Sequence, residues 1–197
     1  MPRAAGQIDP KKSEAILEAA QDLLSERGLQ VSMAEIARKA GVSKQTLYNR
    51  FPSKTEIGQA LARRRSDAIT APLREPGDPL RVLTGFARAM IEKVCAPERA
   101  VSLRGVALMS AEAPEVARAV YEGGPAESLR RLSAWLAQQH AEGRLVVRDP
   151  DAAAEMFSGM VLGHAHLRHV MGVPHPVFDI DAKAQDAAIR FIRAFSA

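Results

Sequence analysis

The side chains best suited to chemistry gather in one stretch, residues 32–54, which reads SMAEIARKAGVSKQTLYNRFPSK. Its second half offers ammonium, amide and phenol groups that point away from the apolar positions. Such groups form hydrogen bonds with base edges and with phosphate oxygens. The pattern therefore predicts contact with DNA through Lys44, Gln45, Tyr48 and Asn49.

Two short helices joined by a tight turn must hold these side chains. Ser32 followed by Glu35 is a capping box, which predicts a helix start directly before an apolar set. Gly41 follows that helix, where glycine adopts the left-handed conformation without strain, and Ser43 suits the N-cap of the next helix. Because Leu47 then faces the core, the segment predicts a helix-turn-helix.

Within this motif the polar side chains have separable roles. Lys44 and Gln45 begin the second helix and are the candidates for reading guanine or adenine edges. Tyr48 can bind a phosphate, and Lys54 adds charge where the free N–H groups of the following helix hold another phosphate. The alternative for Arg50 and Lys54 is that they are solvated surface charges.

Positive charge is concentrated in the N-terminal third of the chain. Residues 1–65 carry 12 Lys and Arg against 7 Asp and Glu, a net charge of +5, whereas the remainder carries 15 against 16, a net charge of −1. A basic domain attracts the phosphate backbone through a salt-dependent term that ignores sequence. The run Arg63, Arg64 and Arg65 is either a solvated face or a further DNA contact.

Composition argues against several other classes of protein. The 197 residues, 47% hydrophobic and 25% charged, suit one small and one medium globular domain. The single cysteine, Cys95, excludes an internal disulfide and favours a buried hydrophobic role over a redox role. Since we find no signal-peptide pattern and no apolar run of about 18 residues, we expect a cytoplasmic protein without a membrane partner.

The sequence offers no support for catalysis or metal binding. It contains no GxSxG elbow, Walker loop or GxGxxG, so we expect neither enzymatic activity nor a cofactor. His164, His166 and His169 do not share one helical face, and neither HExxH nor Cys/His spacing accompanies them. We therefore expect no metal site, and we expect polar roles for these histidines at an interface or in a ligand pocket.

Helix signals cover nearly the whole chain, so the expected fold class is all-α. Asp-Pro pairs at 9–10, 78–79 and 149–150 each place an N-cap acid before a proline suited to the first helical position. We expect a flexible arm at 1–9, whose Arg3 can touch DNA, a three-helix DNA-binding domain at 10–71 with its motif at about 33–52, and a C-terminal domain at 78–197. Beyond the motif, helices are expected near 10–27, 53–71, 79–95, 98–111, 114–140, 150–171 and 181–196. The helix at 114–140 is either continuous or broken at 123–125. Residues 145–147 are expected to form a loop rather than a strand.

The segments ILEAAQDLLSERG and SMAEIARKAGVSKQTLYNRFPSK, over about residues 10–60, closely resemble the TetR family of bacterial transcriptional regulators. The resemblance implies an all-helical homodimer that binds a palindromic operator, usually represses, and releases DNA when a small molecule enters the C-terminal domain. A glycine is frequent in the family where Gln45 stands, so Gln45 is either a base reader or a mild obstacle. When the positions that match the DNA-binding motif of the family are included, the predicted DNA-binding residues are Ser32, Ser43, Lys44, Gln45, Thr46, Tyr48, Asn49, Arg50 and Lys54.

The C-terminal part is expected to form the homodimer. Gly159 and Gly163 lie four residues apart on the helix expected at 150–171 and would let a partner helix approach closely. The helix expected at 181–196 carries an apolar stripe, which packs either against a partner or within its own subunit. The predicted interface residues are Gly159, Gly163, Ala188, Phe191, Ile192 and Phe195.

Soft and aromatic side chains on the middle helices are the candidates for an effector pocket, because such groups adapt to varied apolar guests. They favour an apolar or amphipathic small molecule, with ordinary core packing as the alternative for each residue. The pocket candidates are Phe86, Met90, Leu108, Met109, Tyr121, Trp135, Met156, Met160 and His164.

Two rival functions stay open beside a ligand-responsive regulator. One is a protein of the same fold that organises or occludes DNA without an effector. The other is a small-molecule-binding dimer that has no specific DNA binding. A selective operator whose binding weakens with a metabolite would indicate the regulator.

Overall fold

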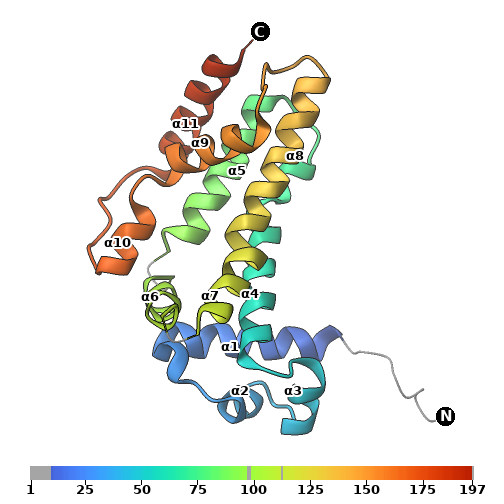
Figure 1. The fold of residues 1–197 in the computed structure, drawn as a ribbon, viewed down its shortest axis with the longest axis vertical. Helices are drawn as coiled ribbons and strands as arrows, with labels where there is room; N and C mark the ends of the chain where they lie inside the picture. Colours follow the sequence, from blue (N-terminus) through green and yellow to red (C-terminus); the bar gives the residue numbers. More distant parts are fainter. Residues whose placement is uncertain (1–9, 97–98, 112, 197) are drawn as a thin grey trace, which may run out of the picture.

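The computed structural model describes residues 10–96, 99–111 and 113–196, and the regular structure in these ranges is helical, which confirms the all-α fold. Figure 1 shows a small head below a larger helical bundle, with α4 running from one into the other. The head contains α1 (Pro10–Arg27), η1 (Gly28–Gln30), α2 (Met33–Lys39) and α3 (Lys44–Arg50). The helices that follow are α4 (Lys54–Ile69), η2 (Ala71–Arg74), α5 (Pro79–Val94), α6 (Arg99–Met109), α7 (Pro114–Tyr121), η3 (Glu122–Ala126), α8 (Glu127–Ala141), α9 (Pro150–Leu162), α10 (Ala165–Met171) and α11 (Ile180–Phe195).

The head has a hydrophobic core of its own, formed by one apolar face from each of its helices. Ile16 of α1, Ile36 of α2 and Leu47 of α3 are at most 1% exposed and belong to one cluster. Ile57 and Leu61 of α4 complete this cluster, so α4 is anchored in the head at its N-terminal end. The short motif helices are therefore fixed by tertiary packing as well as by their caps.

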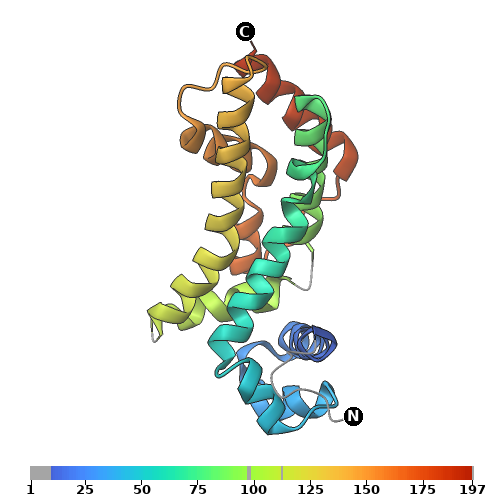
Figure 2. The same ribbon diagram turned by 90° about the vertical axis from the view of Figure 1, so that its right-hand side faces the viewer.

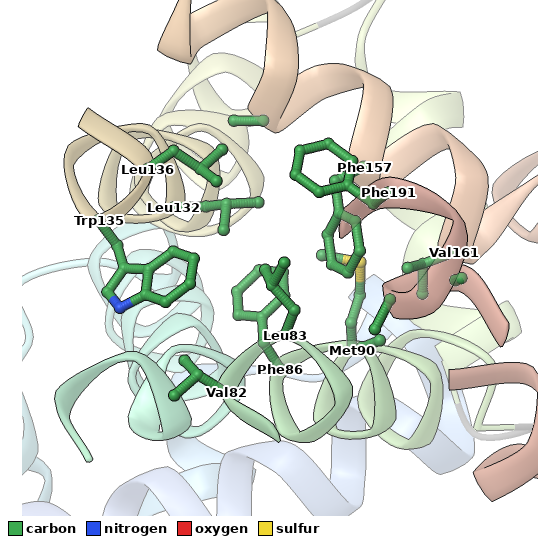
Figure 3. Packing of buried hydrophobic residues seen from close by; sticks show 14 of the residues in the cluster. Val82, Leu83, Phe86, Met90, Leu132, Trp135, Leu136, Phe157, Val161 and Phe191 are labelled. Atoms are coloured by element: carbon green, nitrogen blue, oxygen red, sulfur yellow. The ribbon is translucent and has the colours of Figure 1, made fainter. Parts of the chain in front are cut away.

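The bundle encloses a second and larger core, in which α5 packs against α9 and α11, and α8 packs against α9. Figure 3 shows aromatic rings at its centre. The ring of Phe157 meets that of Phe191 edge-on, with centroids 4.9 Å apart, and lies 6.1 Å from the ring of Phe86. Trp135 of α8 closes one side of this core. These rings belong to α5, α8, α9 and α11, so they hold the bundle together.

Helix α4 is tied to both lobes by polar contacts. Arg64 donates from Nη1 to Glu14 Oε1 and from Nη2 to Gln21 Oε1 on α1, each over 2.5 Å. Further along α4, Ser66 accepts a hydrogen bond from Ser128 of α8 at 2.9 Å. In Figure 2, α4 descends from the bundle to the head as one continuous helix. Helix α4 is therefore in direct contact with both the head and the bundle.

Most expected helices are present, but the one expected at 150–171 is wrong. The chain breaks at Gly163, which has φ 51° and ψ −124° and ends α9 before α10 begins. Residues with a Cβ rarely adopt such a positive φ, so glycine is required here to turn the chain. The region around 123–125 does not break the helix, because the π-helical turn η3 carries α7 into α8. Residues 145–147 form a loop, as expected, with the N–H of Val146 bonded to Phe195 O at 2.8 Å.

Candidate nucleic-acid interface

The first motif helix, α2, begins in the predicted capping box. The backbone N–H of Glu35 donates to Ser32 Oγ at 3.2 Å, and the N–H of Ser32 donates to Glu35 Oε2 at 2.8 Å. Arg27 adds an ion pair of 2.7 Å to the other carboxylate oxygen. Hydrogen bonds from Ser32, and then the one from Arg27, lower the pKa of Glu35 to about 2. This carboxylate therefore stays ionised and holds the start of α2 at neutral pH.

The turn between the motif helices also follows the expected chemistry. Gly41 has φ 65°, and the next N–H, that of Val42, reaches back to Ala37 O over 3.0 Å. Ser43 then caps α3, since its Oγ accepts from the N–H of Thr46 at 3.1 Å and contacts Thr46 Oγ1 at 2.8 Å. Both hydroxyls are occupied in shaping the turn, so Ser43 and Thr46 position α3 in addition to any phosphate contact.

Helix α3 has one buried face and one polar exposed face. Leu47 is fully buried, whereas the Tyr48 side chain is 47% exposed. Gln45 donates from Nε2 to Asn49 Oδ1 at 2.7 Å, which orients the two amides along the helix. The exposed row comprises Lys44, Gln45, Tyr48 and Asn49, the four residues expected to reach a groove.

Arg50 and Lys54 occupy different environments. Arg50 is partly buried, and its Nη1 donates to Ser13 Oγ on α1 at 2.6 Å, so this side chain braces α3. Lys54 is exposed at the first residue of α4, whose N-cap is Ser53. Sequence reasoning missed Ser13, because no local pattern indicates a partner 37 residues away from Arg50.

The arginine run is not one uniform solvated face. Arg64 is committed to the ion pair with Glu14 on α1. Arg65 is partly buried, and burial, followed by the charge of Arg64, lowers its pKa from the usual range. Arg63 points to a cleft between α4, η3 and α8. Consecutive residues on a helix point in different directions, which explains why the three side chains have three surroundings.

The predicted effector residues do not line one common cavity. Phe86, Met90 and Trp135 are at most 9% exposed and belong to the bundle core. The remaining described candidates are exposed and are spread over α6, α7, α9 and the junction of α9 with α10. For Met109 the side chain lies outside the described part of the chain. Core packing is therefore the role of the three buried residues, and the exposed ones are Leu108, Tyr121, Met156, Met160 and His164.

The predicted interface residues also divide into two groups. Ala188 and Phe191 are 0% exposed within their own subunit, so their side chains are not available to a partner. Phe191 and Phe195 have ring centroids 4.5 Å apart, and Ile192 and Phe195 pack partly on the same core. By contrast, Gly159 and Gly163 are exposed, and a Cβ built on either would meet no other residue within 4 Å. Among the predicted interface residues, the two glycines are therefore the exposed ones.

One of the three predicted histidines, His169, contacts a further histidine, His175. His169 is 4% exposed, and its Nε2 lies 2.8 Å from Val94 O and 3.3 Å from Nε2 of His175. Within the described residues, no group of three or more His, Cys, Asp or Glu side chains is arranged to hold a metal ion. Cys95 is partly buried, and burial raises the pKa of its thiol. In the same part of the chain, no helix is long and apolar enough to cross a membrane.

Comparisons with known proteins match both lobes. The family model described as bacterial regulatory proteins, tetR family, matches residues 16–61, and that of the AefR-like transcriptional repressor, C-terminal domain, matches residues 81–197. Among curated proteins, the HTH-type transcriptional repressor KstR2 of Mycobacterium tuberculosis is 35% identical over 99 residues, which are 48% of this chain and 49% of that protein. This match spans about half the length of the curated relative.

Two solved structures extend the similarity over nearly the whole chain. A TetR-family transcriptional regulator from Mesorhizobium loti has a TM-score of 0.80 at 23% identity, covering 98% of this chain and 100% of that one, and this likeness shows the fold alone. The flavonoid-responsive regulator FrrA has a TM-score of 0.68 and is 30% identical, covering 95% of this chain and 98% of its own.

Proposed function

This chain belongs to the TetR family of bacterial regulatory proteins, and from that premise we propose that it is a transcriptional regulator rather than an enzyme. It binds a palindromic operator as a homodimer, represses transcription, and leaves the DNA when a small-molecule effector binds the bundle. The observation that carries this proposal is the exposed polar row on α3. The row is held in place by a helix-turn-helix in which both α2 and α3 begin at a capped residue.

The row on α3 divides into side chains that read bases and side chains that hold the backbone. Lys44 and Gln45 stand in the first turn of α3, where they reach guanine or adenine edges, and each good contact discriminates by about 1–3 kcal/mol. Tyr48 and Lys54 bind phosphates, which positions the head without selecting a sequence. The hydrogen bond between Gln45 and Asn49 sets the direction of both amides. This orientation supports Gln45 as a base reader rather than an obstacle.

The net charge of +5 in residues 1–65 supports a phosphate-binding head. Such charge raises affinity for all DNA through counterion release, and it makes binding strongly dependent on salt. Specificity then has to come from the few side chains that reach base edges and from the spacing of two heads in a dimer. A dimer also explains why the expected operator is a palindrome.

An exposed apolar stripe on α9 supports dimerisation. Met156 and Met160 are 59% and 42% exposed, and they share one helical face with Ala152 and Gly159. Next to this stripe, Met156 and Phe195 line an apolar groove of about 380 Å³ between α9 and α11. Two copies that pair α9 and α11 would cover both features in a four-helix interface. Ala188 and Phe191 support this surface from inside their own subunit.

Selection of bound sequences from random duplex DNA, at near-physiological salt, tests this function. Tyr48→Ala, run in parallel, serves as the control, because it removes a backbone contact and leaves the fold intact. An enriched palindrome that is lost in Tyr48→Ala is the expected result. No enrichment would reject the regulator: cooperative coating of any sequence would favour a DNA-occluding protein, and absence of DNA binding would favour a ligand-binding dimer.

A further inference from the structure

A polar cleft of about 250 Å³ opens on the bundle where α4 meets α7, η3 and α8. Figure 1 shows α7 beside α4 immediately above the head. Gln59 and Arg63 line one wall from α4, Glu122 lies opposite on η3, and Glu127 and Arg131 close the end on α8. The cleft is therefore bounded by the helix that enters the head and by the bundle.

Glycine keeps this cleft open. A Cβ on Gly123 would lie 3.4 Å from Gln59 O and 3.6 Å from the Cγ atom of Arg63, an ordinary contact distance. A larger side chain at this position would extend into the space between the walls. The neighbouring Gly124 brings η3 close to α4, since its Cβ would lie 3.2 Å from that of Ala62. These glycines belong to the π-helical turn, a feature found frequently at functional sites.

The charges at the α8 end of the cleft already have partners. Arg131 donates to Glu127 Oε1 and to Asp67 Oδ1, each over 2.6 Å, and to Thr70 Oγ1 over 2.9 Å. Arg130 holds the same glutamate from outside the cleft. Hydrogen bonds from Arg130 and then Arg131 lower the pKa of Glu127 to about 2, so it remains ionised. This end is a rigid and neutral wall.

The other three polar groups have no such partners. Among the described residues, Arg63, Gln59 and Glu122 make no hydrogen bond or ion pair, although all three line the cleft. The cleft thus presents one guanidinium and one amide on α4, and one carboxylate on η3. Arg63 and Glu122 are exposed, so water hydrates them in the free protein. A bound molecule can take the place of this water if it offers a carboxylate to the guanidinium and an ammonium group to the carboxylate.

We propose that this cleft binds a small zwitterion, a molecule of amino-acid size with a carboxylate and an ammonium group, as the effector of the proposed regulator. Arg63 binds the carboxylate, Glu122 binds the ammonium group, and Gln59 donates or accepts a further hydrogen bond. The cleft is smaller than the usual range of about 300–1,000 Å³ for drug-sized ligands, which fits a small metabolite. Binding of a zwitterion in this cleft does not depend on the proposed function. Its role as the effector does rest on that function.

The polar lining of this cleft favours a different effector from the apolar or amphipathic one expected from the sequence. That expectation depended on aromatic and methionine side chains, of which Phe86, Met90 and Trp135 are packed in the bundle core. Filling a site between them would require opening a close-packed interior, whereas the polar cleft exists without any rearrangement. The position on α4 also places the ligand on the helix that starts with Lys54 in the DNA interface.

The experiment measures ligand binding to the full chain in the absence of DNA. Each of the standard amino acids, at millimolar concentration, is the zwitterionic probe; acetate, ethylammonium and decanoate test the carboxylate, ammonium and apolar parts alone. Thermal shift identifies a binder and calorimetry measures its affinity. We expect at least one amino acid to bind and the three partial probes to give no shift.

Variants then locate the site. Arg63→Gln, Glu122→Gln and Gly123→Leu should each weaken the binding by about ten-fold or more, because each removes a charged partner or fills the cleft. Arg118→Gln and Glu115→Gln are the matched controls, since both residues are exposed on α7 and do not line the cleft. Gly123→Ala should fold and bind, because its added Cβ makes ordinary contacts.

Three results would overturn the inference: no amino acid binds, decanoate binds in place of the amino acids, or binding survives Arg63→Gln and Gly123→Leu unchanged. These outcomes are separate from the selection of operator DNA. If an operator is selected and no zwitterion binds, the regulator stands and the cleft assignment falls. If a zwitterion binds in the cleft and no operator is selected, the ligand site stands and the regulator falls.

Discussion

The Nη1 atom of Arg50 on α3 lies 2.6 Å from the Oγ atom of Ser13 on α1, so a charged hydrogen bond fastens the second motif helix to the first helix of the head. Arg50 is partly buried at this contact. The orientation of α3 in the head therefore depends on α1, which lies outside the motif itself.

Replacing Ser13 tests this brace. Ser13→Ala leaves the buried part of the Arg50 guanidinium without an acceptor, so we expect the free energy of unfolding to fall by about 1–3 kcal/mol. The selected operator should keep its consensus, because neither atom of the contact reads a base. Ser13→Thr keeps the hydroxyl and is the matched control. Chemical denaturation measures the effect, and equal stability of the Ala and Thr variants would remove the bracing role from Ser13.

Lys44 should determine sequence discrimination, whereas Tyr48 should determine overall affinity. Lys44→Ala is expected to lower the preference for the matched site over a single-base variant by about 1–3 kcal/mol. Tyr48→Ala should weaken both sites by a similar factor. The measurement is a titration of matched and mismatched duplexes at one salt concentration.

Lys39 provides the control for this comparison. It also lies in the motif, but its Nζ forms an ion pair with Asp22 at 3.1 Å. Lys39→Ala should therefore leave discrimination unchanged. If Lys44→Ala and Lys39→Ala change the ratio of the two affinities equally, Lys44 does not read a base.

Gly159 offers a cleaner test of the dimer than Gly163. A side chain at Gly163 would be strained by its positive φ, so a substitution there would disturb the fold as well as the interface. Gly159 lies inside α9, is exposed, and has open space around a built Cβ. Gly159→Leu should split the dimer by preventing close approach of the partner, and it should lower operator affinity at a distance from the DNA.

Gly159→Ala controls for the gain in helix propensity, because it adds only one small group. Sedimentation velocity reports the association state of each variant, and circular dichroism reports the fold. A Gly159→Leu protein that remains a full-affinity dimer would show that α9 pairs through another face, or that it does not pair.

The contact between His169 and His175 predicts a loss of stability below neutral pH. Burial, and then the charges of His169, Arg168 and Lys183, lower the pKa of His175 below its usual 6.5. The unfolded chain then binds more protons than the folded protein as the pH falls through 6.5. The free energy of unfolding is therefore greatest above this pH and decreases below it until the lower folded pKa is reached.

His175→Gln should flatten this dependence, because it removes the titrating group. His164→Gln is the control, since His164 is exposed at the junction of α9 and α10. Denaturation midpoints measured from about pH 7.5 to about pH 5 give the comparison. A His175→Gln protein with the same pH slope as the unchanged chain would assign the dependence to another group.

The helix caps and the turn of the motif in the head can be predicted from the sequence alone. The capping box of Ser32 and Glu35, the positive φ of Gly41 and the N-cap of Ser43 involve atoms no more than three residues apart, so their sequence spacing is enough to predict them. The polar row on α3 follows from the same logic, because successive side chains on a helix point about 100° apart, which turns Tyr48 away from the buried face of Leu47.

Which apolar and charged faces meet depends on contacts between helices that are distant in the chain. The sequence placed Gly159 and Gly163 on one expected helix as a surface for a partner, but Gly163 turns the chain. Phe191 is buried in its own subunit rather than exposed to a partner. Likewise, the cleft joins Arg63 to Glu122 across 59 positions of sequence. Helix periodicity shows that a face is apolar or charged, whereas the partner of that face depends on packing between helices distant in the chain.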